Sequence, residues 1–257
     1  MIRFCLLGSG SSGNALLVCT PQSRILVDNG LSYRQLERRL GEVGERLDRL
    51  DAVLITHEHG DHVNGLGALI RRIPAPVFMT RATHEALPQS VGVLPRVEVF
   101  EAGETLAVAD LRIASFSVSH DAADPVSYVL QCDGATLGIA ADLGYASTLV
   151  RARLRGAHAL VLEANYCPEM LRQGRYPHAV QQRIRSRRGH LSNQAMQSLL
   201  TELIHHRLRL VVLVHISEEN NDPALAVRAA REVLRQSGIE VHVARQDRPT
   251  PMFEIHS

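Results

Sequence analysis

A short apolar run followed at once by a dense group of imidazole and carboxylate side chains constrains this chain more than any other feature. Residues 52–56 read AVLIT, and residues 57–62 read HEHGDH. A short, continuously apolar run is typical of a buried strand. The sequence therefore predicts that several polar side chains gather where a buried strand ends, which is where sites are built in α/β sheets.

Short β-rich runs alternate with helical patterns along the chain. Residues 106–139 have the pattern of antiparallel strands, and Asp133-Gly134 is a hairpin turn signal. We expect two packed mixed sheets with helices outside, in one domain over residues 1–257. The strands are predicted at 3–7, 15–19, 25–28, 52–56, 77–80, 159–162 and 210–214, and the helices at 33–40, 62–73, 196–204 and 226–234.

Composition bounds the function only loosely. The chain has 257 residues, 45% of them hydrophobic, which suffices for a substantial core. Its formal net charge of +1 calls for neither a nucleic-acid nor a membrane partner. The four cysteines form no C-x-x-C pair, and we find no signal peptide or membrane-length apolar run. These features predict a cytoplasmic protein with reduced thiols and no membrane partner.

The polar group after the strand has the character of a metal site. His57 and His59 are two residues apart, so on an extended segment they point to the same side, and Asp61 and His62 follow. Imidazole and carboxylate ligands suit Zn²⁺, and also Mn²⁺ or Fe²⁺. Four such ligands do not easily serve one tetrahedral ion and leave an open position, so we expect two neighbouring divalent ions. The alternative is a histidine-rich surface loop.

Three further polar residues stand where apolar strands stop. His120 ends FSVSH, Asp142 ends LGIAAD, and His215 ends LVVLVH. Each could instead be a hydrogen-bonded terminal residue, but together with the central group they would complete two sets of three ligands and one bridge. The other histidines lack such a context and are expected on the surface or in packing; they are His84, His158, His178, His205, His206, His242 and His256.

These residues resemble those of the metallo-β-lactamase-fold hydrolases over nearly the whole chain. The resemblance implies a four-layer αββα sandwich with the metals at one edge. It assigns one ion to His57, His59 and His120, and the other to Asp61, His62 and His215, with Asp142 as the bridge. Asp28, which ends RILVD, matches the carboxylate that supports the site from an early strand.

Four sequence runs are similar to the YycJ/WalJ branch of that family. They are GSGSSGN (residues 8–14), RYPHAVQQRI (175–184), GHLSN (189–193) and HISEENNDP (215–223). The branch is associated with nuclease activity, including 5′→3′ exonuclease action on DNA. This chain has Gln181 and Gln182 where the family generally carries a basic pair. That departure weakens the transfer of substrate contacts.

A second resemblance, to RNase Z, implies a catalytic Glu–His pair at Glu163 and His190. In this hypothesis a metal-bridging hydroxide attacks the phosphodiester, and Asp61 orients it. His190, polarised by Glu163, would protonate the leaving oxygen as a general acid. An ordinary buried hydrogen-bonded pair is the alternative for these two residues.

Six arginines and no acidic residue occur between residues 171 and 201. Arginine binds phosphate strongly and often in a bidentate manner, so we expect Arg183 and Arg188 to contact a nucleic-acid substrate, together with Asn193 of the GHLSN run. The alternative is a solvated basic face. Two other functions also remain open: hydrolysis of a small ester, thioester or lactam, and metal-dependent regulation without turnover.

Overall fold

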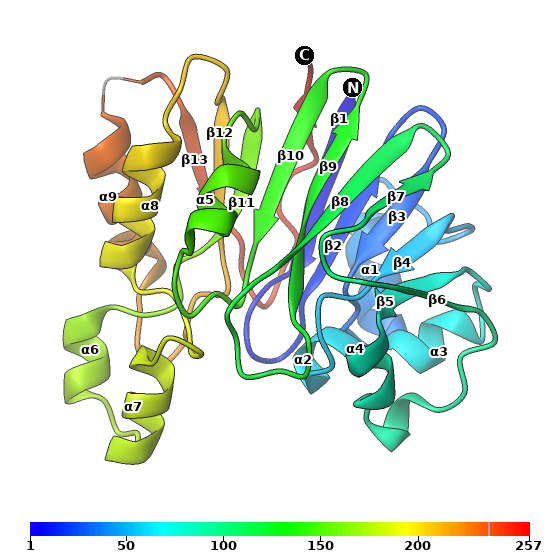
Figure 1. The fold of residues 1–257 in the computed structure, drawn as a ribbon, viewed down its shortest axis with the longest axis horizontal. Coiled ribbons are helices and arrows are strands. Elements are labelled where there is room, and N and C mark those ends of the chain that lie inside the picture. The colour runs from blue at the N-terminus through cyan, green and yellow to red at the C-terminus, as the bar shows by residue number, and fades with distance from the viewer. Residues whose placement is uncertain (236) are drawn as a thin grey trace.

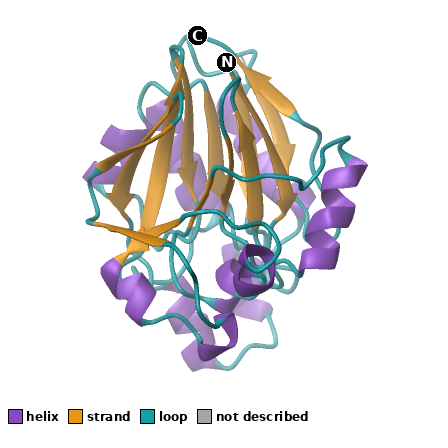
Figure 2. Cartoon of the chain, turned by 90° about the vertical axis from the view of Figure 1, so that its right-hand side faces the viewer, coloured by secondary structure: helices purple, strands orange, loops and turns teal. Residues whose placement is uncertain are grey.

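The computed structural model describes residues 1–235 and 237–257 of the chain. Two β-sheets pack face to face, and helices cover the outer face of each sheet (Figures 1 and 2). The expected α/β fold with two mixed sheets and four layers is confirmed. None of the helices in these residues is both long and apolar enough to cross a lipid bilayer.

The first sheet is built from the N-terminal half of the chain and one C-terminal strand. Its order is β14-β1-β2-β3-β4-β5-β6. The pairs from β14 to β3 are antiparallel, and those from β3 to β6 are parallel. The strands are β1 (Ile2–Gly8), β2 (Ala15–Cys19), β3 (Arg24–Val27), β4 (Ala52–Leu54), β5 (Val77–Thr80), β6 (Val97–Phe100) and β14 (Phe253–Ile255).

The second sheet repeats this pairing pattern, although the sequence shows no repeat. Its order is β13-β12-β11-β10-β9-β8-β7, antiparallel from β7 to β10 and parallel from β10 to β13. Asp133 and Gly134 form the predicted β9–β10 turn, both with positive φ. The strands are β7 (Thr105–Val108), β8 (Leu111–Ser117), β9 (Val126–Cys132), β10 (Ala135–Ala140), β11 (Ala159–Glu163), β12 (Leu210–Val214) and β13 (Glu240–Val243).

The helices lie on the outer faces and at one edge of the sandwich. The helices between strands β3 and β6 of the first sheet are α1 (Tyr33–Glu42), α2 (Gly60–Val63), α3 (Leu66–Ile70), α4 (Arg81–Glu85) and the 3₁₀ helix η1 (Gln89–Val91). The helices between strands β10 and β13 of the second sheet are α5 (Thr148–Leu154), α6 (Pro168–Gln173), α7 (His178–Arg185), α8 (Asn193–Leu203) and α9 (Pro223–Leu234). The helices α6 and α7 project beyond the sheets at the lower left of Figure 1.

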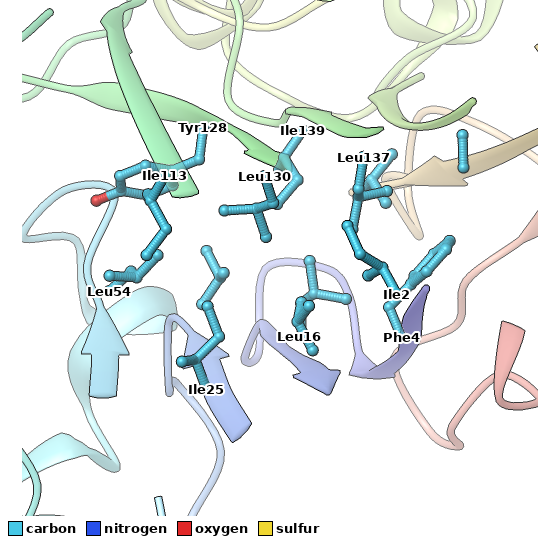
Figure 3. Close-up of a cluster of buried hydrophobic side chains, with 14 of the residues drawn as sticks. Ile2, Phe4, Leu16, Ile25, Leu54, Ile113, Tyr128, Leu130, Leu137 and Ile139 are labelled. Atoms are coloured by element: carbon cyan, nitrogen blue, oxygen red, sulfur yellow. The ribbon is translucent and has the colours of Figure 1, made fainter. Parts of the chain in front are cut away.

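The inner faces of the two sheets form the central core. Figure 3 shows Leu16, Ile25 and Leu54 of the first sheet opposite Ile113 and Leu130 of the second, and all five are buried. Two further apolar clusters fill the spaces between each sheet and its helices. Side chains on both faces of the central strands are therefore buried, which explains why these strands read as continuous apolar runs.

The helix predicted at residues 62–73 is wrong in its bounds, because the chain forms two short helices there. The helical bond from the Gly65 N–H to the Asp61 carbonyl is not made. The Asp61 carbonyl accepts instead from the Asn14 N–H (2.7 Å), and the Gly65 N–H donates to the Asn29 carbonyl (2.9 Å). Docking on the loops after β1 and β3 thus interrupts the helix next to the polar group.

Candidate metal centre

The polar residues at the strand ends meet at one edge of the sandwich. His57 follows β4 of the first sheet, and Asp142 and His215 follow β10 and β12 of the second. Parallel strands bring their carboxyl ends to the same edge of a sheet. Two groups of side chains that could hold a metal ion are His57, His59 and His120, and His57, His62 and Asp142. A third comprises Asp142, Glu163, His190 and His215.

Three polar residues that follow strands, Asp28, Asp142 and His215, adopt the left-handed backbone conformation, although none of them is glycine. The φ angles are 60° at Asp28, 51° at Asp142 and 54° at His215. That conformation is unfavourable for residues with a Cβ and concentrates at functional sites. The backbone reverses sharply at each strand end, and the surrounding hydrogen bonds hold it there; the His215 N–H, for example, donates to Ser9 Oγ (2.8 Å).

The first three-histidine group is compact. The ring centroids of His57 and His59 are 4.6 Å apart, and that of His120 is 5.1 Å from each. The Nδ1 atom of His120 donates to the Gly189 carbonyl at 3.0 Å, which turns Nε2 of His120 toward His59 Nδ1 at 3.3 Å. A hydrogen bond on one ring nitrogen fixes the tautomer that leaves the other free to ligate a metal.

Asp61 and Asp142 connect His62 and His215 into a second group. The Nε2 atom of His62 lies 3.3 Å from Asp61 Oδ2 and 3.0 Å from Asp142 Oδ2. On the other side, Asp142 Oδ1 lies 2.8 Å from His215 Nδ1, and Asp61 Oδ2 lies 3.6 Å from His215 Nε2. Asp142 thus stands between the two histidines, each of its oxygens facing a different imidazole.

Asp28 supports this arrangement from the end of β3. Its carboxylate accepts from the Thr56 backbone N–H and from Thr56 Oγ1, both at 2.8 Å, and from His62 Nδ1 at 2.8 Å. These contacts fix the segment that leaves β4 and orient the His62 ring with Nε2 toward Asp61 and Asp142.

The imidazoles fall into two electrostatic classes. Burial lowers the pKa of His57 and of His120, so both rings are neutral at pH 7. Burial acts in the same direction on His62 and His215, but the facing Asp142 carboxylate overrides it and raises the pKa of both well above the ordinary value. Protons on His62 and His215 therefore balance the carboxylate charge, a role that a divalent cation would take over.

The donor set fits divalent metal ions. His57 Nε2 and His215 Nε2 are buried atoms without a hydrogen-bond partner in residues 1–235 and 237–257. Buried polar atoms normally have partners, and leaving one unpaired costs free energy. Here the two atoms belong to side chains that both lie beside the Asp142 carboxylate, and imidazole and carboxylate are ligands suited to Zn²⁺ or Mn²⁺.

Glu163 and His190 form a pair at the margin of this centre. The Oε1 atom of Glu163, at the end of β11, lies 2.7 Å from His190 Nδ1. Its Oε2 atom accepts from the Leu143 N–H at 2.7 Å and the Leu191 N–H at 3.1 Å. The His190 ring centroid is 5.1 Å from that of His120 and 5.0 Å from that of His215, which places it beside both groups.

The residues expected to contact substrate are less uniform in their surroundings. Arg183 forms an ion pair with Asp121, and Arg188 Nε donates to the His120 carbonyl at 3.5 Å. The Asn193 side chain is buried and exchanges two hydrogen bonds with Asn221, of 2.9 and 3.0 Å. Of the three, Arg188 is best placed for a ligand at the metal centre.

Two residues near the centre were not anticipated from the sequence. The Asn14 amide nitrogen lies 3.0 Å from Asp61 Oδ2 and 3.1 Å from His62 Nε2. The Glu58 carboxylate accepts from the Ala123 N–H (2.8 Å) and so ties the HEHGDH run to the loop that carries His120. The GSGSSGN run that contains Asn14 was noted only for its resemblance to the YycJ/WalJ branch, which gave no reason to single out one side chain.

Comparison with known proteins places the chain in a family. A profile of the "Beta-lactamase superfamily domain" matches residues 23–216. Exodeoxyribonuclease YycJ of Bacillus anthracis is 35% identical over 99% of this chain and 94% of its own length. Exodeoxyribonuclease WalJ of Streptococcus pneumoniae is also 35% identical, over 98% of both chains.

A solved structure with the same fold is that of Zn²⁺-bound PqqB from Methylobacterium extorquens. Its TM-score is 0.74 at 18% identity, and the match covers 96% of this chain and 99% of PqqB. At this identity the likeness concerns the fold alone, and it agrees with the two-sheet sandwich described above. The chain therefore belongs to the β-lactamase superfamily and, within it, to the family that includes the exodeoxyribonucleases YycJ and WalJ.

Proposed function

We propose that the chain is an exodeoxyribonuclease that uses two divalent metal ions and degrades DNA in the 5′→3′ direction. The family membership supports the substrate and the reaction class. The observation that carries the proposal is the convergence of buried, unpartnered ligand atoms from strand ends of both sheets, within the part of the chain that the structure describes. The two ions would activate water and neutralise charge on the phosphoryl oxygens.

The first ion would be held by His57, His59 and His120. His57 and His120 are neutral imidazoles whose Nδ1 atoms have protein partners, since Thr56 Oγ1 lies 3.0 Å from His57 Nδ1 and the Gly189 carbonyl accepts from His120. This leaves Nε2 of both rings for the metal.

The second ion would be held by Asp61, His62 and His215, with Asp142 between the two ions. Asp142 shares one candidate metal group with His57 of the first set and another with His215 of the second, which supports this bridging position. Asp61 has one oxygen near both histidines, and the positive charges on His62 and His215 keep its pKa well below the usual range although burial opposes this. The carboxylate is thus ionised and also available to orient the attacking water.

His190 would be the general acid that protonates the leaving 3′-oxygen. Burial opposes ionisation of Glu163, but the interaction with His190 and the hydrogen bonds lower the pKa of this carboxyl. An ionised Glu163 makes His190 Nδ1 the donor and leaves Nε2 to face the reacting group. The alternative, metal binding by Glu163, is less favourable because its two oxygens already accept from His190 and two backbone N–H groups.

Phosphate binding is assigned to Arg188 before Arg183. The Asp121 carboxylate neutralises Arg183, whereas Arg188 lies against the loop of His120. Asn193 is proposed to position the loop before α8 through its buried pair with Asn221, and not to touch the substrate.

The test uses oligodeoxynucleotides labelled at the 5′ or the 3′ end, a circular single strand, and matched RNA, with Mn²⁺ or Zn²⁺. We expect labelled mononucleotide from the 5′-labelled DNA, shortened products from the 3′-labelled DNA and an intact circle. Asp61→Ala should abolish cleavage, and Asp48→Ala, which changes an exposed aspartate of the α1–β4 loop, should not. Intact linear DNA with the wild-type protein, or cleavage of the circle, would contradict the proposal.

A further inference from the structure

Arg187 and Arg188 follow α7 and lie against the loops of the metal centre. Ser119 Oγ donates to the Arg187 carbonyl at 2.7 Å, and Arg188 Nε donates to the His120 carbonyl at 3.5 Å. Two residues on, the Gly189 carbonyl accepts from His120 Nδ1. The backbone of this segment is therefore fixed to the loop that carries one of the proposed metal ligands.

The Arg187 side chain is held by an aromatic ring. The guanidinium carbon of Arg187 lies 4.3 Å from the ring centroid of Tyr145, which is half-buried, while Arg187 itself is exposed. A guanidinium that stacks on an aromatic face keeps its N–H donors in the plane, available to an anion, and loses less conformational freedom when it binds one. The stack therefore preorganises Arg187 for ligand binding.

This pair is close to the proposed reaction site. Tyr145 comes three residues after Asp142, so the two Cα atoms are at most about 10 Å apart. Gly144 allows the close approach of the two loops, because a Cβ on Gly144 would lie 2.2 Å from the Arg187 carbonyl oxygen. The Gly144 N–H also donates to the Ser119 carbonyl at 2.8 Å.

Two of the six arginines between residues 171 and 201 lie beside the metal centre and lack a neutralising carboxylate in the described part of the chain. Arg172 pairs with Glu169, and Arg183 pairs with Asp121. Arg187 and Arg188 form no ion pair with any carboxylate among the described residues 1–235 and 237–257. Free positive charge therefore lies beside the metal centre, where a polyanionic strand has to pass.

We infer that Tyr145, Arg187 and Arg188 form a binding site for a phosphodiester group next to the one that is cleaved. Arg187, stacked on Tyr145, and Arg188 donate to the non-bridging oxygens of that group and fix the strand across the metal centre. The inference rests on the proposed function, because the ligand is the DNA strand being degraded. It adds Tyr145 and Arg187 to the residues expected to bind substrate.

Steady-state kinetics on a single-stranded oligodeoxynucleotide, repeated over a range of salt concentrations, test this site. Arg187→Gln should raise KM about tenfold with kcat within about twofold. The negative slope of log(kcat/KM) against log[salt] should become less negative by roughly 0.7, the value for one lost phosphate contact on a single strand. Tyr145→Leu should also raise KM, because Arg187 loses the ring on which it stacks. Tyr145→Phe, which keeps the ring, should match the wild type.

Arg112→Gln is the matched control. Arg112 is exposed at the start of β8, and His120 follows the other end of this strand, so the variant should keep both KM and the salt slope of the wild type. An unchanged KM and slope in Arg187→Gln would overturn the inference. A raised KM in Tyr145→Leu with an unchanged KM in Arg187→Gln would also overturn the inference, because the ring would then bind a base of the substrate and not position Arg187. A wild-type protein that cleaves no DNA would instead refute the proposed function, and the inference with it.

Discussion

His190 Nδ1 lies 2.7 Å from Glu163 Oε1, and the second oxygen of Glu163 accepts two backbone N–H groups. Three hydrogen bonds of 2.7 to 3.1 Å therefore fix the carboxylate, with His215 Nδ1 a further 3.3 Å from Oε1, and the carboxylate fixes the His190 imidazole. This relationship orients His190 from the margin of the candidate metal centre, between the rings of His120 and His215. His190 is therefore proposed to transfer a proton, a role distinct from that of the residues that would hold the ions.

The first prediction concerns that proton. His190→Ala should lower kcat on DNA by about 10²–10⁴-fold, because the leaving 3′-oxygen loses its acid. The p-nitrophenyl ester of thymidine 5′-phosphate has a leaving group that needs no proton, so on this substrate the loss should be far smaller. His178→Ala, which changes an exposed histidine on α7, should behave as wild type. Equal losses of kcat on both substrates would show that His190 is not the acid.

The second prediction concerns Asn14, which lies outside the expected ligand set. Its amide is 3.0 Å from Asp61 Oδ2 and orients that carboxylate. Residues that orient metal ligands typically contribute 10–100-fold to metal affinity, so Asn14→Ala should weaken metal binding by about this factor. Competition with a chromophoric chelator measures it. Asn64→Ala, an exposed asparagine after α2, should retain the wild-type affinity; equal affinity in both variants would refute a positioning role for Asn14.

The third prediction compares two glycines. A Cβ on Gly30 would lie 1.8 Å from the Asp61 carbonyl oxygen, whereas a Cβ on Gly41 of α1 has no atom within 4 Å among the described residues. Gly30→Ala should lower the free energy of unfolding by about 1–3 kcal/mol through overpacking. Gly41→Ala should raise it by up to about 1 kcal/mol, since alanine favours the helix. Urea denaturation decides, and a Gly30→Ala variant as stable as wild type would show that the loops are not tightly packed.

The fourth prediction concerns the pH dependence of stability. Burial raises the pKa of the Cys5 thiol from 9.0 to about 11. The folded protein thus keeps this proton where the unfolded chain loses it. The stability that the buried, protonated thiol contributes is fully present below pH 9 and is lost as the pH rises to about 11, a change of about 3 kcal/mol. Relative to Cys5→Ala, the wild type should lose unfolding free energy over this interval. Parallel curves for the two proteins would contradict the burial of an ionisable thiol.

The sequence was most informative where one physical cause dominates. Strands buried on both faces read as apolar runs, and a polar residue at the end of such a run was the signal for His120, Asp142 and His215. The structure brings all three to one edge. The predicted hairpin turn at Asp133-Gly134 followed in the same way, from the local backbone preference of these two residues.

Other features depend on contacts between distant segments, which no local pattern encodes. The helix α7 was not predicted because Val180 and Ile184 are its only large apolar residues, and none of its residues is buried. The pairing of β14 with β1 joins the two ends of the chain. The sequence favoured Arg183 and Arg188 among the six arginines, but in the structure Asp121 neutralises Arg183, and Tyr145 stacks against Arg187, which the sequence did not single out. Such differences come from the tertiary structure alone.

The most direct test of the central claim is metal content measured together with DNA cleavage. Protein reconstituted with excess Mn²⁺ or Zn²⁺ and then desalted should contain about two ions per chain by elemental analysis and should degrade linear single-stranded DNA from its 5′ end. Asp142→Ala, which removes the proposed bridge, should hold at most one ion and lose cleavage. A wild-type protein that is fully active with one ion per chain, or that binds two ions and leaves DNA intact, would contradict the account.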